Sequence, residues 1–369
     1  MMKASAKLLP ALVLAVVMTG CGDQRVLEKL GFSQTSSYDI ADHDLTEFAV
    51  SIPRAEPQAQ TKREVLSAVA PSGKEARIKL ARQTNLLLVS GQLRNTLFSV
   101  AIARNGMEKL LDTLVRDPSV SPRLKISIVN GNAKKLLEKE YKQHPVTGKY
   151  IDGLLEKEAI GRTIPLTTLY SFTRDLYDDG IDPVAPVLKD EGDHIKIDGI
   201  GLFRDDRYMT KIPPSEGLVF AFLRGSFKQG EVSVHLTEEK NSAKSAIMFS
   251  SILSRRSVKV RRDASGTPSI HYHIKMKGAV LEYTGNASLA EDSEREQIER
   301  QVAKELTRRG EAIIKHMQQN RVDSLGMGIA VRNRMSYAAW KKLNWPEVYP
   351  EVKATCSFNV LINNIGKVE

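Results

Sequence analysis

Cysteine is almost absent from this chain, since Cys21 and Cys356 are the only two among 369 residues. Small secreted scaffolds that depend on disulfides need several pairs, so the count excludes that class. One bridge between the two cysteines is compatible with the count alone. The role of Cys21 therefore has to be settled from its surroundings.

Long apolar runs are also missing. The longest spans residues 8–18 and is interrupted only by Pro10. It is too short for a membrane-spanning helix, which needs about 20 residues, but it has the length of a signal-peptide core. Lys3 and Lys7 precede it, as in an export signal. No later segment approaches the length of a span, so any membrane attachment has to come from this end.

The apolar run ends at Met18-Thr19-Gly20-Cys21, which resembles a bacterial lipobox. In that chemistry the thiol receives diacylglycerol as a thioether, and the cysteine becomes the new amino terminus. The alternative is a plain secretory signal with an incidental cysteine, but a cysteine placed at the apolar-to-polar junction favours lipidation. We therefore predict lipidation at Cys21, which leaves Cys356 as a lone thiol.

Aromatic residues are few, at 6%, whereas Lys and Arg outnumber Asp and Glu by 54 to 44, a formal charge of +10. This surplus suits an anionic surface but is also common among ordinary soluble monomers. The basic run of residues 255–262 lacks the aromatic residues or motif of a nucleic-acid module. We predict no nucleic-acid partner and interpret the run as a solvated strand face, with contact to anionic lipid or a protein partner as the alternative.

Motifs for catalysis and cofactor binding are missing. There is no G-x-S-x-G or H-E-x-x-H, Gly148-Lys149 is followed by Tyr150, and the G-x-G at 326–328 follows a predicted helix. His271 and His273 share a predicted strand face, but no third ligand accompanies them and nearby lysines would repel a cation. The prediction is a protein without catalytic residues, metal or cofactor.

Apolar periodicity predicts an α+β chain of several domains, with mixed or antiparallel sheets packed with helices. A hairpin is expected around the Asp205-Asp206 turn, over residues 195–212. Other expected strands are residues 45–53, 231–237, 257–263, 269–285 and 353–366. A helix is expected over residues 107–114, and a strand, turn and helix over residues 123–137.

A long amphipathic helix is expected near the C-terminus, from Ser288 to Gln319, with Ser288 and Glu291 as a capping box. Its apolar stripe consists of Ile298, Val302, Leu306, Ile313 and Met317. Cys356 shares an apolar strand face with Phe358, Val360 and Ile362, so it is expected to be buried. Trp340 and Trp345 are interpreted as anchors of a loop, with an interaction patch as the alternative.

Composition shifts divide the chain into four parts. We predict a lipoprotein signal peptide over residues 1–20 and an N-terminal α/β domain with a membrane tether over 21–195. A small middle domain or hairpin region follows over 196–237, and a C-terminal α+β domain over 238–369. The tether is the polar stretch from Asp23 to about Arg63, and the proline-containing stretch 180–194 is a plausible boundary.

Several stretches resemble, in order, the Ger(x)C lipoproteins, the C subunits of bacterial spore germinant receptors. Residues 90–120 resemble the N-terminal helical region of that family, and residues 199–212 resemble its central hairpin. One departure is Gly22 after the lipobox, where family members often have Trp. At the C-terminal end the matching positions are Asp323, Gly326, Gly328, Trp340, Trp345 and Gly366.

The resemblance implies a fold of several α/β domains with unusual topology. It also implies a non-catalytic subunit, lipid-anchored on the outer face of the spore inner membrane. Its partners would be the integral membrane A and B receptor subunits, and it would help convert nutrient detection into germination. Whether the subunit binds nutrient directly stays open. The alternatives are an extracytoplasmic solute-binding lipoprotein, for which two lobes of repeated βαβ pattern are missing, and an envelope hydrolase.

Overall fold

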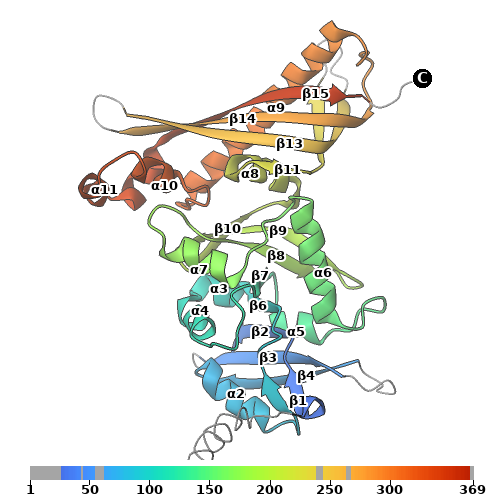
Figure 1. Ribbon diagram of the computed structural model, residues 1–369, viewed down its shortest axis with the longest axis vertical. Coiled ribbons are helices and arrows are strands. Elements are labelled where there is room, and N and C mark those ends of the chain that lie inside the picture. Colours follow the sequence, from blue (N-terminus) through green and yellow to red (C-terminus); the bar gives the residue numbers. More distant parts are fainter. Residues whose placement is uncertain (1–25, 43–44, 55–61, 238–243, 263–266, 366–369) are drawn as a thin grey trace, which may run out of the picture.

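The computed structural model describes residues 26–42, 45–54, 62–237, 244–262 and 267–365. The molecule is elongated, with two large sheets that follow one another along its long axis (Figure 1). The first described elements, η1 (Leu27–Lys29) and β1 (Leu30–Phe32), lie at one end, and the second sheet lies at the other. Cys21 and Gly366 lie outside the described residues.

The first sheet has eight strands in the order β10-β9-β8-β7-β6-β2-β3-β4. The central pairs, from β2 through β6 and β7 to β8, are parallel, whereas the outer pairs on both sides are antiparallel. A separate short strand, β5 (Leu87–Val89), pairs with β1. The bounds are β2 (Thr35–Ile40), β3 (Thr46–Pro53), β4 (Arg63–Ala70), β6 (Asn95–Ser99), β7 (Lys125–Val129), β8 (Val184–Asp190), β9 (Ile195–Arg204) and β10 (Arg207–Ile212).

Helices cover both faces of this sheet. Apolar residues of four helices pack with one face, and apolar residues of the other two pack with the opposite face. The first group is α2 (Gly73–Ala81), α3 (Val100–Asn105), α4 (Glu108–Val115) and α7 (Leu169–Tyr177); the second is α5 (Ala133–Glu138) and α6 (Thr147–Ile160). The expected helix after Gly106 is confirmed as α4, and Gly106 at φ +116° separates it from α3.

The second sheet follows the order β11-β13-β14-β15, with β12 also paired to β13. β14 and β15 are parallel, so the chain between them makes a crossover that contains α9 to α12. The strands are β11 (Phe227–Lys228), β12 (Val232–Thr237), β13 (Lys244–Arg262), β14 (Pro268–Tyr283) and β15 (Lys353–Asn364). The helices are η2 (Pro214–Glu216), α8 (Gly217–Arg224), α9 (Asp292–Gln319), α10 (Met327–Arg332), α11 (Tyr337–Leu343), α12 (Trp345–Val348) and η3 (Tyr349–Glu351).

The long helix α9 packs against β15, and every residue of its expected stripe is buried. The two elements approach closely at Gly310, where a Cβ would lie 2.7 Å from the Sγ of Cys356. Cys356 is buried, as expected, and its burial raises the pKa of the thiol to about 12. In the described residues no helix is long and apolar enough to cross a membrane.

The expected capping box at the start of α9 is wrong. The helix begins at Asp292, and no side-chain hydrogen bond is formed by its N-cap, Glu291. The backbone N–H of Ser288 instead donates to the carboxylate of Glu294, and Arg295 pairs with Asp292. Carboxylates inside the first turn thus take the place of the predicted cap, which fits the positive end of a helix dipole.

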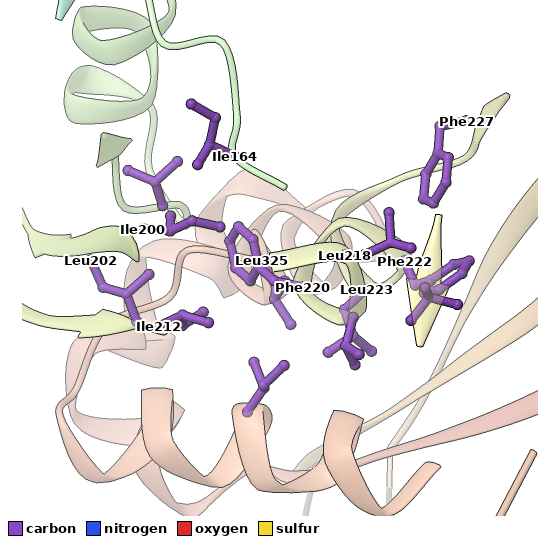
Figure 2. Packing of buried hydrophobic residues seen from close by; sticks show 14 of the residues in the cluster. Ile164, Ile200, Leu202, Ile212, Leu218, Phe220, Phe222, Leu223, Phe227 and Leu325 are labelled. Atoms are coloured by element: carbon purple, nitrogen blue, oxygen red, sulfur yellow. The ribbon is translucent and has the colours of Figure 1, made fainter. Parts of the chain in front are cut away.

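One continuous hydrophobic core joins the two sheets (Figure 2). Ile200 of β9 and Ile212 of β10 contribute from the first sheet, and Phe220 and Leu223 contribute from α8. The same cluster continues into the inner face of the second sheet, for example at Ile274. Burial of this many apolar side chains holds the two halves together far more firmly than a polar domain contact would.

The expected tether over residues 23–63 is wrong for its larger part. The strand expected over residues 45–53 is confirmed as β3, but β1 and β2 also lie within the stretch, and β2 is paired on both sides inside the first sheet. Although β2 is polar, two of its buried polar side chains, Ser36 and Asp39, have partners. The hydroxyl of Ser36 donates to that of Thr96 at 3.0 Å. The carboxylate of Asp39 accepts from the backbone N–H groups of Ala133 and Lys134 at 2.8 Å each. A hydropathy pattern misses a strand whose buried groups are satisfied this way.

The segment expected as a middle unit, residues 196–237, is divided between the sheets. The hairpin β9–β10, confirmed around Asp205-Asp206, forms an edge of the first sheet, whereas β11 and β12 pair with β13. The stretch 180–194 contains β8, which lies between β7 and β9. The α+β class with mixed sheets and a long C-terminal helix is confirmed, and the exact domain boundaries stay a prediction.

Candidate functional site

A cleft of about 450 Å³ opens where the two halves meet. Its walls come from the end of α7 and the loop after it (residues 176–182), the β9–β10 turn, and the segment of residues 321–349. We call the residues that make contacts between these walls the junction cluster. It brings together positions 323, 326, 328, 340 and 345, which the sequence singled out, with residues of the first half that it did not.

Asp323 is the centre of the junction cluster. Its carboxylate is buried and accepts hydrogen bonds from the backbone N–H groups of Met327 at 2.8 Å and Gly328 at 2.7 Å. The indole Nε1 of Trp345 donates to the same carboxylate at 3.0 Å. Asp323 therefore fixes both the start of α10 and the position of α12, as a buried acceptor with three donors can.

Asp182 links this centre to the first half of the chain. Its carboxylate accepts from the backbone N–H of Asp323 at 2.5 Å and from that of Asp205 in the β9–β10 turn at 3.1 Å. In return, the backbone N–H of Asp182 donates to the carbonyl of Asp323 at 3.0 Å. One side chain thus ties together the loop after α7, the hairpin and the crossover of the second sheet.

Two glycines let the backbones of the halves touch. Gly180 has φ +98°, and a Cβ on it would lie 2.7 Å from the backbone carbon of Gly328. A Cβ on Gly328 would lie 2.5 Å from the Cα of Gly180 and 2.6 Å from the indole nitrogen of Trp345. The carbonyl of Gly180 accepts from the backbone N–H of Ile329 at 3.0 Å. Neither position has room for a side chain.

Both tryptophans are buried here, as an anchoring role requires, but they lie on the helices α11 and α12 rather than in a loop. The rings of Trp340 and Trp345 lie 5.8 Å apart, and Tyr349 packs 5.7 Å from Trp345. The hydroxyl of Tyr349 donates to the carbonyl of Val322 at 2.6 Å. These three aromatic side chains all line the cleft.

Ion pairs bridge the two halves at the rim. Arg332 donates to the carboxylate of Asp178 at 2.7 Å, and Lys341 donates to that of Asp179 at 2.8 Å. The neighbouring Lys341 lowers the pKa of Asp179 below its usual value. Exposed pairs such as these contribute little each, so the buried groups around Asp323 carry the contact.

Burial raises the pKa of Asp182 to about 6, and it raises the pKa of Asp323 well above its ordinary value. Repulsion by the carboxylate of Asp205 raises the pKa of Asp182 further, and repulsion by Asp182 raises that of Asp323. An isolated aspartic acid titrates near pH 4, so between about pH 4 and 6 the folded chain binds more protons than the unfolded chain. The junction is therefore more stable at the acidic side of this window.

We expect the free energy of unfolding to fall by about 2 kcal/mol as the pH rises from 4.5 to 7, because Asp182 loses its proton in the folded state. Asp182→Asn should weaken this dependence, as measured by urea titration at several pH values. Asp179→Asn is the matched control, since its pKa is lowered and its effect falls at more acidic pH. An unchanged slope in Asp182→Asn would contradict the assignment.

The hydrogen bonds of the junction cluster connect the two halves of the chain. Both oxygens of Asp323 are occupied by donors from the chain, and those of Asp182 are too. In the described residues no group of three or more His, Cys, Asp or Glu is placed to hold a metal ion. His271 and His273 lie on the second sheet, where their rings contact the hydroxyls of Thr355 and Ser357 at 2.8 to 3.1 Å.

Comparison with known proteins decides the family. Residues 23–190 match the model described as the spore germination protein N-terminal domain. Residues 198–366 match the one described as spore germination B3/GerAC like, C-terminal. The chain belongs to the Ger(x)C family of spore germination proteins. The two matched regions meet at β8 and β9, so the junction cluster joins one to the other.

A curated relative and a solved structure agree with this. The spore germination protein GerQC of Bacillus cereus is 26% identical over 360 residues, which cover 97% of this chain and 98% of GerQC. The crystal structure of the GerBC protein has the same fold, with a TM-score of 0.59 and 16% identity, over 91% of this chain and 100% of GerBC. The resemblance drawn from the sequence is therefore confirmed.

Sequence reasoning found half of the junction cluster. Asp323, Gly328 and Trp345 came from the resemblance, but Gly180 and Asp182 were missed. The available signal was a glycine followed two residues later by Asp, in a loop that also contains Asp178-Asp179. Gly at φ above zero and Asp as an acceptor of backbone N–H groups both suit such a loop.

Proposed function

We propose that this chain is the lipid-anchored, non-catalytic C subunit of a nutrient germinant receptor, required for spores to germinate in response to nutrients. Its partners are the integral membrane A and B subunits. The observation that carries the proposal is the match of both family regions, in order, over nearly the whole chain. The similarity to GerQC over almost all of both chains supports it further.

The absence of catalysis is part of this proposal. The cleft is lined by carboxylates, but Asp323 and Asp182 are hydrogen-bonded to the backbone, and Asp178 and Asp179 are paired with cations. The partners of these carboxylates within the chain support a structural role for them. The solute-binding alternative finds no support, because the sheets do not form two βαβ lobes around a cleft.

We propose that the chain acts on the outer face of the spore inner membrane, held by the lipid on Cys21. In that position the first half lies next to the membrane, because β1 follows Cys21 closely in the sequence and lies at one end of the molecule (Figure 1). The long axis then carries the second sheet away from the anchored end.

Deletion of the gene should abolish germination in response to at least one class of nutrient and leave a receptor-independent trigger effective. The measurement is the fall in optical density of purified spores after exposure to a panel of nutrients, with the complemented strain as control. Unchanged responses to every nutrient, in a strain without a second copy of the family, would overturn the proposal.

A further inference from the structure

In the part of the chain that the structure describes, one face of the second sheet has no helix packed over it. In β13, β14 and β15 alternate side chains are buried against α9 and α8, and the others point outward. We call the outward set the basic face. It consists of Arg255, Ser257, Lys259 and Arg261 on β13, Ser269, His271, His273, Lys275 and Lys277 on β14, and Lys353, Thr355, Ser357, Asn359 and Leu361 on β15.

The basic face contains no Asp or Glu. None of its cations forms an ion pair within the described part of the chain, although ion pairs are common elsewhere. The strand register places Arg255 beside Lys275 and Lys259 beside His271. Neighbouring strands lie about 5 Å apart, so these positive groups repel one another in the isolated chain.

The pKa of His273 reflects the positive charge around it. Its pKa is lowered by partial burial and then by the nearby Lys275, His271 and Lys259. The fold thus gathers positive side chains on the basic face without an acidic side chain to balance them. A surface of this kind gains free energy when an anionic group approaches.

The basic face is hollowed rather than flat. A groove of about 340 Å³ lies across the strands at one end of it, with Lys259, Arg261 and Lys353 around His271 and Thr355. Cations two residues apart on one strand, such as Lys259 and Arg261, are about 6.6 Å apart along the chain. The same repeat describes alternate side chains of an extended peptide, so acidic residues at every second position would match the cations.

We propose that the basic face binds an extended acidic segment of a partner protein, whose carboxylates pair with the cations of β13, β14 and β15. A bilayer of anionic lipid is the less suitable partner, because the face lies at the end of the molecule opposite to the first described residues (Figure 1). A groove also suits a narrow chain better than a plane of headgroups. The choice of a protein segment over a bilayer rests on the proposed lipid anchor at Cys21, whereas the binding of an anionic partner rests on the charge pattern alone.

The test uses the purified chain with Cys21→Ala, so that no lipid contributes, and a short fluorescent peptide of alternating Glu and Ser as the probe. Lys259→Glu with Lys275→Glu, both exposed, should weaken binding about tenfold or more in fluorescence anisotropy. Lys304→Glu with Lys315→Glu is the matched control: the same change of charge on the outer surface of α9 should weaken binding less than about twofold.

Neutral variants guard against an effect of misfolding. Lys259→Gln with Lys275→Gln should weaken binding severalfold while the melting temperature stays that of the parent. Equal loss in the basic-face variant and the α9 control would overturn the proposal, as would absence of binding by the parent chain. The proposal would also be overturned if vesicles of phosphatidylglycerol and phosphatidylcholine bound the parent tightly and the basic-face variant weakly, while the peptide bound both chains equally.

These measurements are independent of germination. The binding assay uses only the purified chain, whereas the receptor role is measured in spores that lack the gene. A chain that binds the peptide through the basic face but has no effect on germination would retain this inference and overturn the proposed function. A chain that is needed for germination but does not bind the peptide would overturn this inference and retain the proposed function.

Discussion

Gly328→Ala should lower the free energy of unfolding by roughly 3 kcal/mol, because there is no room for one methyl group in the junction cluster. The new Cβ would lie 2.5 Å from the Cα of Gly180 and 2.6 Å from the indole nitrogen of Trp345. Backbone atoms cannot move aside as the end of a flexible side chain can. Relief therefore requires the two halves to separate locally, which also weakens the bonds to Asp323.

The chain's only two tryptophans provide the measurement, since Trp340 and Trp345 both lie in the junction cluster. Urea titration followed by tryptophan fluorescence reports on the junction, and circular dichroism reports on the whole chain. We expect the fluorescence transition of Gly328→Ala to shift to lower urea concentration, at or ahead of the transition in circular dichroism.

Gly153→Ala is the matched control. Gly153 lies inside α6, where a Cβ would meet nothing within 4 Å. Alanine is the better helix former by about 1 kcal/mol, so this variant should be as stable as the parent or more stable. A Gly328→Ala chain that unfolds at the same urea concentration as the parent would show that the close approach of the two backbones is not required.

The second half of the fold was largely predictable from sequence, because its periodicity is regular. The stripe of α9 and the alternation in β15 both match their buried faces. The length of β13 was not predictable: residues 257–263 were expected, whereas the strand runs from Lys244 to Arg262. An irregularity at Ser251, with φ +50°, shifts the register against β14 and interrupts the alternation that a pattern search follows.

The first half was harder to predict, because its central strands carry polar residues with tertiary partners. Asp39 in β2 reads as a loop residue until the start of α5, almost 100 positions later, supplies its donors. The same holds at the junction cluster, where Asp182 and Asp323 are 141 positions apart. No local pattern encodes such a pairing, and a resemblance pointed to one partner only.

The basic face shows the opposite situation. Its residues were visible in the sequence as the run around Arg255 to Arg262 and the pair His271 and His273, and the simplest interpretation was a solvated strand. The structure adds the register, which gathers three strands of cations onto one surface without an acidic neighbour. Charge that is dispersed along the chain becomes informative only when the sheet concentrates it.

Cys21→Ala should release the chain from the membrane almost completely. The lipobox chemistry joins diacylglycerol to this thiol, and stable anchoring takes two acyl chains where one is marginal. In a strain that lacks the A and B subunits, loss of the thioether leaves electrostatic attraction to the bilayer, which salt removes. After a high-salt wash, the unlipidated variant should be found in the supernatant, whereas the parent stays in the membrane pellet.

Cys356→Ala is the control for the loss of a thiol, because these are the chain's only cysteines. Cys356 is buried against α9, so its removal costs some packing but should leave the chain in the pellet. Mass spectrometry of the parent adds the direct test, since the mature N-terminal peptide should begin at residue 21 with the mass of a lipidated cysteine. An unmodified Cys21 there, or a Cys21→Ala chain that resists the salt wash, would contradict the anchor.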